Sequence, residues 1–252
     1  MIAYQGREFT TLNDKIYFPG DGSGGKIIKA YYRNNLVYPR TSTIDDIIID
    51  GGGTVTPPLL LRFSNTWNTH SNSRGGDQDT YVVVIDNDGN VSIYIRYSYK
   101  SVKNGKLDID NRSGTAIGNA SRGGRYPVEN IIFKSDYNPS YPDLIDGYYW
   151  LIVKAFSNTT GYYYSTVSYQ DDSVKLNYQL NQDSMPSGNV YIVAVLKVVN
   201  HEVSKVYDQA DLIRFFDENS SMYDTVKAKF GSSNTGSSST FVNSTTNYFT
   251  RI

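Results

Sequence analysis

The sequence of 252 residues contains no cysteine and only two histidines, His70 and His201. Without cysteine the chain has no disulfide, no thiol nucleophile and no thiolate ligand for zinc or an iron–sulfur cluster. Two histidines that lie far apart in the sequence cannot supply a metal centre made of several imidazoles. We therefore expect neither a metal nor another cofactor.

Charged residues are also few, and their signs balance. There are 24 lysines and arginines against 25 aspartates and glutamates, which gives a formal charge of −1. A protein that binds nucleic acid needs a concentrated basic surface to contact phosphates. We therefore expect no nucleic acid among the partners of this protein.

Long apolar runs are missing as well. No run reaches the roughly 18 residues that are needed to cross a bilayer, and residues 1–8 contain no apolar segment of the kind found in signal peptides. We therefore expect no membrane span and synthesis in a cytoplasm.

Tyrosine, by contrast, is abundant, with 23 residues, and it favours the half-buried surfaces of β-sheets. Apolar and mostly polar residues alternate over 91–100 and again over 174–180, which is the period of a strand with one buried face. Segments 148–153 and 190–196 are apolar on both faces, as in central strands that are covered on both sides. This pattern predicts an antiparallel β-sandwich over residues 59–200.

The rest of the chain divides by composition. Two short helices are predicted after the sandwich, because Leu212, Phe215 and Phe216 share one helical face and a second apolar set is spaced by four residues. The prediction is therefore a mainly β protein with five regions. These are an N-terminal β-hairpin region at 1–40, a Gly/Pro-rich linker at 41–58, the sandwich at 59–200, the helices at 201–231 and an extended Ser/Gly-rich tail at 232–252.

Three segments carry parts of ion-binding or phosphate-binding motifs. Gly20–Lys26 has the spacing of a phosphate-binding loop, but Ile27 stands where that loop needs Ser or Thr, and a strand is predicted to follow. Asp86–Asn90 resembles part of a calcium loop without its later glutamate, so we interpret it as a hairpin turn. The oxygen-rich segment Asp108–Asn111 is interpreted in the same way.

Pairs of acidic residues are the remaining catalytic candidates. A glycosidase needs two carboxylates on opposite sides of a sugar, with the pKa of one raised by apolar surroundings. The acids here lie mainly in turn-like segments, and no G-x-S-x-G turn accompanies either histidine. We therefore predict that the protein is not an enzyme. The pairs considered are Asp45/Asp46, Asp77/Asp79 and Asp171/Asp172, and Asp108 and Asp110 are further single candidates.

Aromatic residues around the predicted central strands leave two interpretations open. Trp67, Tyr148 and Trp150 are candidates for contact with a glycan, because sugar rings can stack on aromatic faces. The same residue types dominate protein cores and subunit interfaces, where one end of the ring is apolar and the other forms a hydrogen bond. A subunit of an assembly would bury these rings, whereas a carbohydrate-binding protein would expose a row of them.

The tail at 232–252 is rich in serine and glycine but ends in apolar residues. Such a composition cannot bury enough surface to fold alone. We therefore predict that the tail packs against a neighbouring subunit or partner protein and supports a homo-oligomer, with a trimer as the first expectation. The residues expected to make these contacts are Phe241, Val242, Tyr248, Phe249 and Ile252.

The segment from Ile28 to Pro39 reads as two short strands joined by Asn34-Asn35, which can fill a tight turn. It resembles a hairpin near the N-termini of tailed-bacteriophage virion proteins, especially those of phages that infect Bacteroidetes, including crAss-like gut phages. In that family the N-terminal part docks a fibre, baseplate or head-decoration subunit onto the particle. The residues that we expect to anchor this chain are Tyr31, Leu36 and Tyr38.

Two functions from different classes follow. The leading interpretation is a non-enzymatic structural protein of a virion, either a tail, baseplate or fibre subunit or a capsid decoration. It would be made in the host cytoplasm and would assemble with itself and with other virion proteins. The alternative is a carbohydrate-binding module or adhesin that binds a host surface glycan through its tyrosine and tryptophan rings.

Overall fold

The structure of the chain is a computed structural model. It describes backbone and side chains for residues 59–67, 77–108, 127–157, 163–180, 185–209, 211–230, 239–242 and 249–252. It describes the backbone alone for residues 159–160, 184 and 210 and for the seven N-terminal strands given below.

Two antiparallel sheets pack face to face, so the predicted β-sandwich is confirmed. The six-stranded sheet has the order β10–β9–β14–β19–β20, with β21 parallel to β19. Its strands are β9 (Gln78–Asp86), β10 (Val91–Ile95), β14 (Gly147–Ala155), β19 (Asn189–Val199), β20 (Glu202–Tyr207) and β21 (Thr240–Phe241).

The seven-stranded sheet has the order β11–β12–β13–β8–β16–β17–β22, and all of its neighbouring strands are antiparallel. Its strands are β8 (Leu59–Trp67), β11 (Ser101–Val102), β12 (Gly105–Leu107), β13 (Val128–Lys134), β16 (Tyr163–Tyr169), β17 (Val174–Leu180) and β22 (Phe249–Arg251).

The larger core lies between the two sheets. Every second residue of β8 from Leu59 to Trp67 is buried, because a strand points alternate side chains to opposite faces. Phe63 and Phe133 of the seven-stranded sheet belong to the same cluster as Leu151 and Val193 of the six-stranded sheet.

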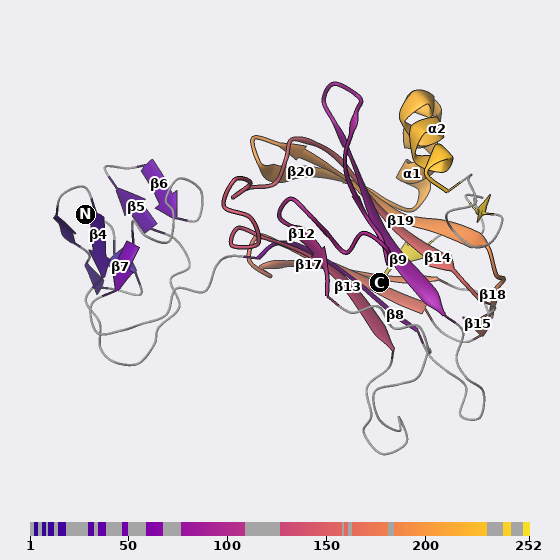
Figure 1. Cartoon of the computed structure of the whole chain (residues 1–252), viewed down its shortest axis with the longest axis horizontal. Coiled ribbons are helices and arrows are strands. Elements are labelled where there is room, and N and C mark those ends of the chain that lie inside the picture. The colour runs from indigo at the N-terminus through magenta and orange to yellow at the C-terminus, as the bar shows by residue number, and fades with distance from the viewer. Residues whose placement is uncertain are drawn as a thin grey trace, which may run out of the picture.

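A second core lies between the six-stranded sheet and two helices, α1 (Ala210–Glu218) and α2 (Ser220–Ala228) (Figure 1). Leu212, Phe215 and Phe216 of α1 and Val226 of α2 pack in one cluster with Trp150 of β14. Strands β9, β14 and β19 are therefore buried on both faces, which confirms the prediction of central strands at 148–153 and 190–196.

The two helices are close to their predicted positions. The backbone N–H and the side-chain amide of Asn219 both donate to the carbonyl oxygen of Phe215 at 2.9 Å, and α1 ends there. Helix α2 follows at once at Ser220. Within the described part of the chain, no helix is long and apolar enough to cross a membrane.

The sandwich uses residues beyond its predicted end at residue 200. Strand β20 pairs with β19, β21 lies beside β19, and β22 pairs with β17 at the edge of the seven-stranded sheet. A small additional pair is formed by β15 (Thr159–Thr160) and β18 (Ser184–Met185).

Seven short strands precede the sandwich. Strands β5 and β6 form the predicted hairpin, with Tyr31 opposite Leu36. Strand β6 begins at Asn35, so the prediction that Asn35 belongs to the turn is wrong. Strand β7 lies inside the predicted linker and pairs in parallel with β4. The seven are β1 (Ala3–Tyr4), β2 (Arg7–Glu8), β3 (Thr10–Leu12), β4 (Lys15–Phe18), β5 (Ala30–Tyr32), β6 (Asn35–Tyr38) and β7 (Ile47–Ile49).

Candidate functional site

The two tryptophans that were candidates for glycan contact lie inside the protein. Trp67 is 1% exposed in the core between the sheets, and Trp150 is 0% exposed beneath the helices. The ring of Trp150 is nearly parallel to those of Phe216 and Tyr223, with interplanar angles of 13° and 9°. Neither tryptophan presents a face to solvent, so the prediction of glycan contact is wrong for both.

Tyr148, the third candidate, is half-buried at the margin of the second core. Its ring centroid lies 5.6 Å from that of Phe215 and 5.7 Å from the Nζ of Lys197. Because the residue is half-buried, it stays partly accessible to solvent. Glycan contact through Tyr148 stays a prediction.

The described parts of the C-terminal tail, residues 239–242 and 249–252, pack on the sandwich of the same chain. Phe249 of β22 is 0% exposed in the core between the sheets, and the ring centroid of Phe241 lies 5.4 Å from that of Phe230. The N–H of Val242 donates to the carbonyl oxygen of Val190 at 2.9 Å. The prediction that the tail packs against a neighbouring subunit is therefore wrong for the buried Phe249. The physical reason is that β21 and β22 complete sheets of the same chain. Phe241 and Val242 are half-buried on their own sandwich, and a further contact of these two residues with a neighbour stays a prediction.

The last residue differs from the rest of the tail. Ile252 is 67% exposed, and only its backbone N–H is engaged, donating to the carbonyl oxygen of Asn177 at 2.9 Å. Contact of the Ile252 side chain with a neighbour stays a prediction. Tyr248 lies outside the described residues.

Asp208, which precedes α1, fixes the last strand of the chain. Its carboxylate accepts hydrogen bonds from the hydroxyl of Tyr178 and from the Nε of Arg251, both at 2.8 Å. Arg251 also forms an ion pair with it through its terminal nitrogen. Burial, together with the neighbouring Asp208 charge, raises the pKa of Tyr178 above its ordinary value. This group joins β17, the start of α1 and β22.

The acidic residues at the surface hold turns and strand ends. The carboxylate of Asp86 accepts the backbone N–H groups of Asp88 at 3.1 Å and of Asn90 at 2.8 Å, and Gly89 has a φ of +83°. This confirms the hairpin turn there. The carboxylate of Asp108 accepts the backbone and side-chain N–H groups of Asn130 at 3.2 and 3.0 Å.

The other acidic pairs are either structural or outside the described residues. Asp171 and Asp172 form a turn, because both residues have positive φ and the N–H of Ser173 donates to the carbonyl oxygen of Gln170 at 3.0 Å. The N–H of Asp77 donates to the Oγ of Ser157 at 2.7 Å. The candidates that lie outside the described residues are Asp45, Asp46 and Asp110.

Asp79 is enclosed between the six-stranded sheet and the helices, with 4% exposure. Its carboxylate accepts a hydrogen bond from the hydroxyl of Tyr81 at 3.0 Å. Lys154 of the neighbouring strand β14 is opposite Asp79 in the strand register and is 0% exposed. Burial lowers the pKa of Lys154, and the charge of Asp79 partly opposes that shift. Burial also raises the pKa of Tyr81. In this position Asp79 is out of reach of a substrate in solvent.

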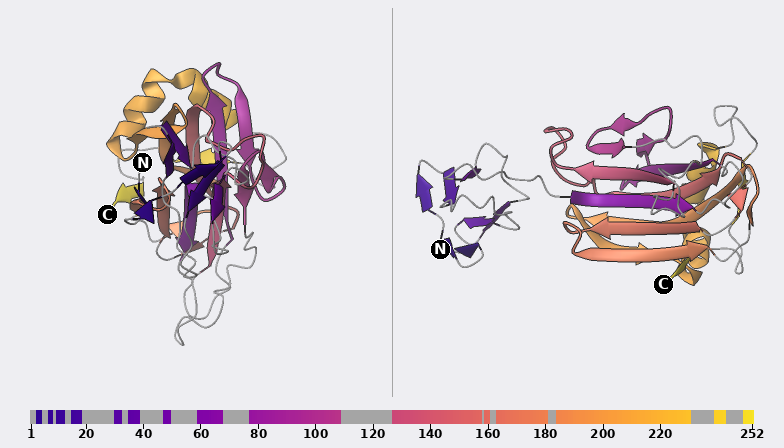
Figure 2. Two further views of the ribbon diagram at one scale, coloured as in Figure 1. Left: turned by 90° about the vertical axis from the view of Figure 1, so that its left-hand side faces the viewer. Right: turned by 90° about the horizontal axis from the view of Figure 1, so that it is seen from below.

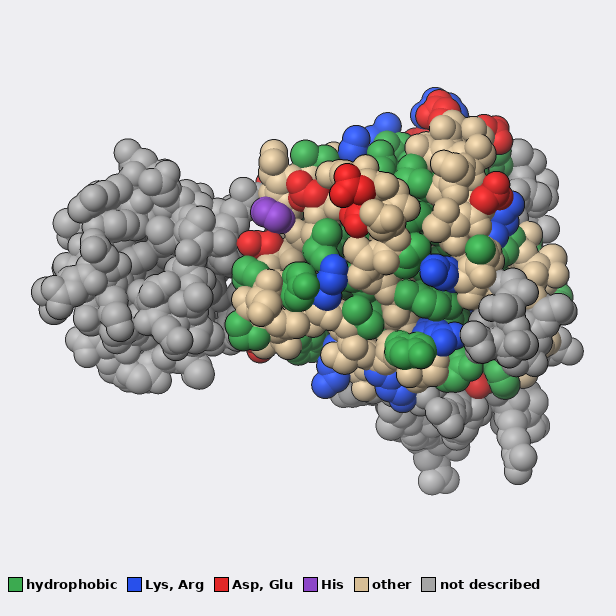
Figure 3. Space-filling view, turned by 45° about the horizontal axis from the view of Figure 1, so that its top comes forward, with side chains coloured by type: hydrophobic (Ala, Val, Ile, Leu, Met, Phe, Trp, Pro, Cys, Tyr) green, Lys and Arg blue, Asp and Glu red, His purple; other side chains and the backbone are tan. Residues whose placement is uncertain are grey.

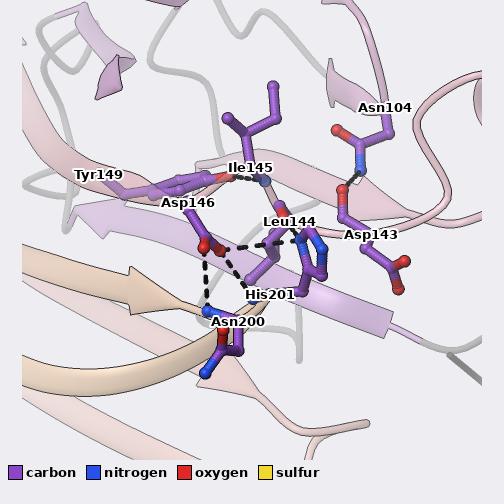
Figure 4. Close-up of polar contacts among 8 residues, drawn as sticks. All are labelled: Asn104, Asp143, Leu144, Ile145, Asp146, Tyr149, Asn200 and His201. Carbon is purple, nitrogen blue, oxygen red and sulfur yellow. Dashed lines mark hydrogen bonds and ion pairs between the residues drawn. The ribbon is translucent and has the colours of Figure 1, made fainter. Parts of the chain in front are cut away.

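His201 lies at the tip of the hairpin between β19 and β20 (Figure 4). Asn200 and His201 have φ values of +52° and +67°, as a type I′ turn requires. The carboxylate of Asp146 accepts the backbone N–H groups of Asn200 at 3.0 Å and of His201 at 2.7 Å. The Nδ1 of His201 lies 2.7 Å from the carbonyl oxygen of Leu144. These contacts tie the hairpin to the loop before β14, which is a structural role. His70 lies outside the described residues.

A polar cluster that the alternation pattern did not predict lies between the sheets. The side-chain amide of Asn65 donates to the Oε1 of Gln78 at 2.9 Å, and the hydroxyl of Ser165 donates to the Oδ1 of Asn65 at 3.1 Å. Glu129 accepts the backbone N–H of Thr80 at 2.8 Å. All of these groups are buried. The sequence did carry a signal for this cluster. In each of two alternating strands, a polar residue occupies an inward position: Asn65 in 59–67 and Ser165 in 163–169.

The outer face of the seven-stranded sheet is the candidate functional site, because no described helix lies over it (Figure 2). One row of side chains crosses five strands of this face. Lys106 of β12 is opposite Ile132, which is opposite Arg62 of β8. Arg62 is opposite Ser168, which is opposite Lys175 of β17. We call these five residues the cationic row.

Two neutral rows run beside the cationic row. The first consists of Asn130, Ser64, Thr166 and Asn177, and the hydroxyl of Thr166 donates to the Oδ1 of Asn177 at 3.1 Å. The carboxylate of Asp108 binds Asn130, so one acidic group borders the end of this row. The second consists of Val128, Thr66, Tyr164, Gln179 and Thr250. Hydroxyl and amide groups therefore make up most of these two rows. The large aromatic residue that they expose is Tyr164, which is 39% exposed.

The cations of this face are only partly neutralised. Arg62 contacts Asp172 at 3.5 Å. The Nζ of Lys106 lies 5.8 Å from the ring centroid of Tyr137, and the Nζ of Lys134 lies 6.0 Å from the same centroid. Among the described residues, Lys106, Lys134 and Lys175 have no acidic partner in an ion pair.

The helix-bearing side differs in this respect. It carries acidic and basic side chains together (Figure 3). Arg214 contacts Asp211 at 2.7 Å, and Lys227 contacts Asp224 at 2.6 Å. The charges on the two helices therefore compensate each other locally, unlike the lysines of the seven-stranded sheet.

The described residues contain no group of three or more His, Asp or Glu side chains that could hold a metal ion. The side chains of the predicted anchoring residues Tyr31, Leu36 and Tyr38 lie outside the described residues. Comparison of the whole chain with protein families, curated proteins and solved structures finds no match.

Proposed function

We propose that this protein is a non-enzymatic structural subunit of a tailed-phage virion, in which the N-terminal strands attach the chain and the sandwich displays its seven-stranded sheet. The observation that carries the proposal is the difference between the two outer faces. The six-stranded sheet is closed by two helices, whereas the seven-stranded sheet presents a polar face over which no described helix lies.

The roles of the polar residues support a structural subunit. Asp86, Asp108, Asp146 and Asp208 each accept hydrogen bonds that hold a turn or a strand. A sandwich with two cores and fixed turns is a rigid element, and rigid elements suit the presentation of a surface.

The N-terminal hairpin supports the attachment role. Strands β5 and β6 pair within the segment that resembles virion proteins, with Ala30 opposite Tyr38 and Tyr31 opposite Leu36. A region this short buries little core by itself, so docking on a larger body would stabilise it. Attachment by the hairpin leaves the sandwich free to face outward.

Incorporation into particles tests this proposal. The double variant Tyr31→Ser/Tyr38→Ser should be absent from purified phage particles, as measured by mass spectrometry, while its circular dichroism spectrum keeps the signal of the folded sandwich. The matched control is Tyr99→Ser/Tyr141→Ser, because these tyrosines are 58% and 37% exposed on the sandwich. The control should be incorporated like the wild type. Normal incorporation of the hairpin variant, or absence of the wild-type chain from particles, would contradict the proposal.

A further inference from the structure

We propose that the cationic row of the seven-stranded sheet binds a linear acidic polysaccharide that carries a carboxylate on every second sugar. The inference deepens the proposed function, because it names a ligand class for the face that the subunit displays. It differs from stacking on tryptophan, because both tryptophans are buried.

The strand register sets the spacing of the charges. Lys106, Arg62 and Lys175 stand on β12, β8 and β17, and one strand lies between each successive pair. Neighbouring strands are about 4.8 Å apart, so the backbone positions of successive cations are roughly 10 Å apart. A linked pyranose ring advances by a length close to one strand spacing. A chain lying across the strands would therefore bring a carboxylate on every second sugar to each cation in turn.

The side chains are placed to meet such a ligand. Lys106 and Lys175 are exposed, because they alternate with inward residues such as Leu107 and Leu176 that pack on the core between the sheets. Arg62 is partly exposed, and Asp172 at 3.5 Å is its acidic partner. Ser168 stands between Arg62 and Lys175 in the strand register and is 2% exposed, so it offers little surface to a ligand.

The charge balance favours an anionic ligand. Lys106 and Lys175 belong to a face on which, among the described residues, they have no acidic partner, although the whole chain has a formal charge of −1. Lys134 adds a further cation beside Lys106, since both face the ring of Tyr137. Several like charges held in one line attract an anionic polymer more strongly than a scattered set does.

The neighbouring rows supply the uncharged part of the recognition. Ser64, Thr166 and Asn177 lie one row away from the cations, and their hydroxyl and amide groups can donate to and accept from sugar hydroxyls. A protein partner would instead select large apolar anchors in the middle of its site. On this face Tyr164 is the exposed large aromatic residue, and it lies two rows from the cations.

Single-stranded nucleic acid fits the site less well. Its binding proteins stack successive bases on several aromatic side chains beside a continuous positive groove. The cationic row contains Ile132 and Ser168 between its charges. Among the described residues a single aromatic ring, that of Tyr137, lies against one of its cations, Lys106, so a series of stacking rings is missing. Nucleic acid is therefore the alternative outcome that the test has to separate.

The test measures binding of the full-length chain to hyaluronate oligosaccharides, which carry one carboxylate per disaccharide, at low salt by isothermal titration calorimetry. The row variant is Arg62→Gln/Lys106→Gln/Lys175→Gln. The control is Lys197→Gln/Lys205→Gln/Lys229→Gln, which removes the same charge from the six-stranded sheet and the end of α2. Dextran serves as the neutral probe and oligo-dT as the nucleic-acid probe.

The proposal predicts that wild type and control bind hyaluronate alike, and that the row variant binds about tenfold or more weakly, since each exposed ion pair contributes up to about 1 kcal/mol. Dextran should not bind measurably. No binding of hyaluronate by the wild type, an equal loss in the control, or binding of oligo-dT at least as tight would each overturn the proposal. None of these outcomes affects particle incorporation, so the failure of this inference and that of the proposed function are distinguishable.

Discussion

The two sheets of the sandwich share one core but differ on their outer faces. The six-stranded sheet buries Trp150 and Ile152 against α1 and α2, so its central strands are enclosed on both sides. The seven-stranded sheet buries its inner residues, and apart from the buried Ser168 its outer face carries exposed or partly exposed lysine, arginine, hydroxyl and amide side chains. The comparison indicates a division of roles, in which the first sheet mainly stabilises the fold and the second provides a surface.

Alkaline pH should produce the largest effect, because it acts on the enclosed tyrosines. Burial raises the pKa values of Tyr81, Tyr149 and Tyr178 above the ordinary 10.0. A raised folded-state pKa gives stability that is complete below pH 10 and is lost as the pH rises, because the unfolded chain ionises first. Each tyrosine contributes about 1.4 kcal/mol per pH unit, so three give roughly 4 kcal/mol per unit above pH 10.

Circular dichroism and tyrosinate absorbance, followed together against pH, measure this effect. The buried tyrosines should ionise only as the sandwich unfolds. Tyr178→Phe should reduce the dependence of stability on pH by up to about 1.4 kcal/mol per pH unit, because it removes one tyrosine whose pKa burial raises. Ionisation of all tyrosines while the circular dichroism signal of the fold is retained would contradict the enclosed positions.

Trp150→Ala should have the next largest effect. The ring is enclosed between β14 and the helices, 5.5 Å from the ring centroid of Phe215. Removing a buried aromatic ring of this size costs about 3–5 kcal/mol of unfolding free energy. Urea denaturation measures the change, and Tyr99→Ala, at a 58% exposed position, should change it by less than about 0.5 kcal/mol. Equal effects of the two substitutions would refute the second core.

Phe249→Ala should destabilise the protein by about 3 kcal/mol, at the lower end of the range for a buried phenylalanine because β22 lies at a sheet edge. Ile252→Ala, three residues later and 67% exposed, should have little effect on stability. Denaturation curves at several protein concentrations show whether Phe249 stabilises its own sandwich or a contact with a second chain. A loss that depends on concentration would indicate that the tail docks on a second chain rather than on its own sandwich.

The sequence predicted the strands and helices of the fold better than it predicted which surfaces they pack against. Alternation over 174–180 and apolar runs at 148–153 and 190–196 report burial of strands directly, and the structure confirms these assignments. The helical face of Leu212, Phe215 and Phe216 is equally local information. Local patterns do not say which surface an apolar residue meets, and the tail was therefore assigned to a neighbouring subunit.

The cationic row could not be predicted from local sequence patterns for the same reason. Lys106, Arg62 and Lys175 are far apart in the sequence, and they share a row only because of the registers of β12, β13, β8, β16 and β17. The tryptophans were conspicuous in the sequence but are buried. Register comes from long-range pairing, which a single sequence does not display.

The most direct test of the division of roles joins stability and binding in one variant, Arg62→Gln/Lys106→Gln/Lys175→Gln. Because these side chains lie on a face over which no described helix lies and form one surface ion pair among the described residues, the unfolding free energy should stay within about 1 kcal/mol of the wild type. Hyaluronate binding by the same folded protein should fall about tenfold or more. A variant that is destabilised as strongly as Trp150→Ala, or that binds hyaluronate like the wild type, would contradict the account.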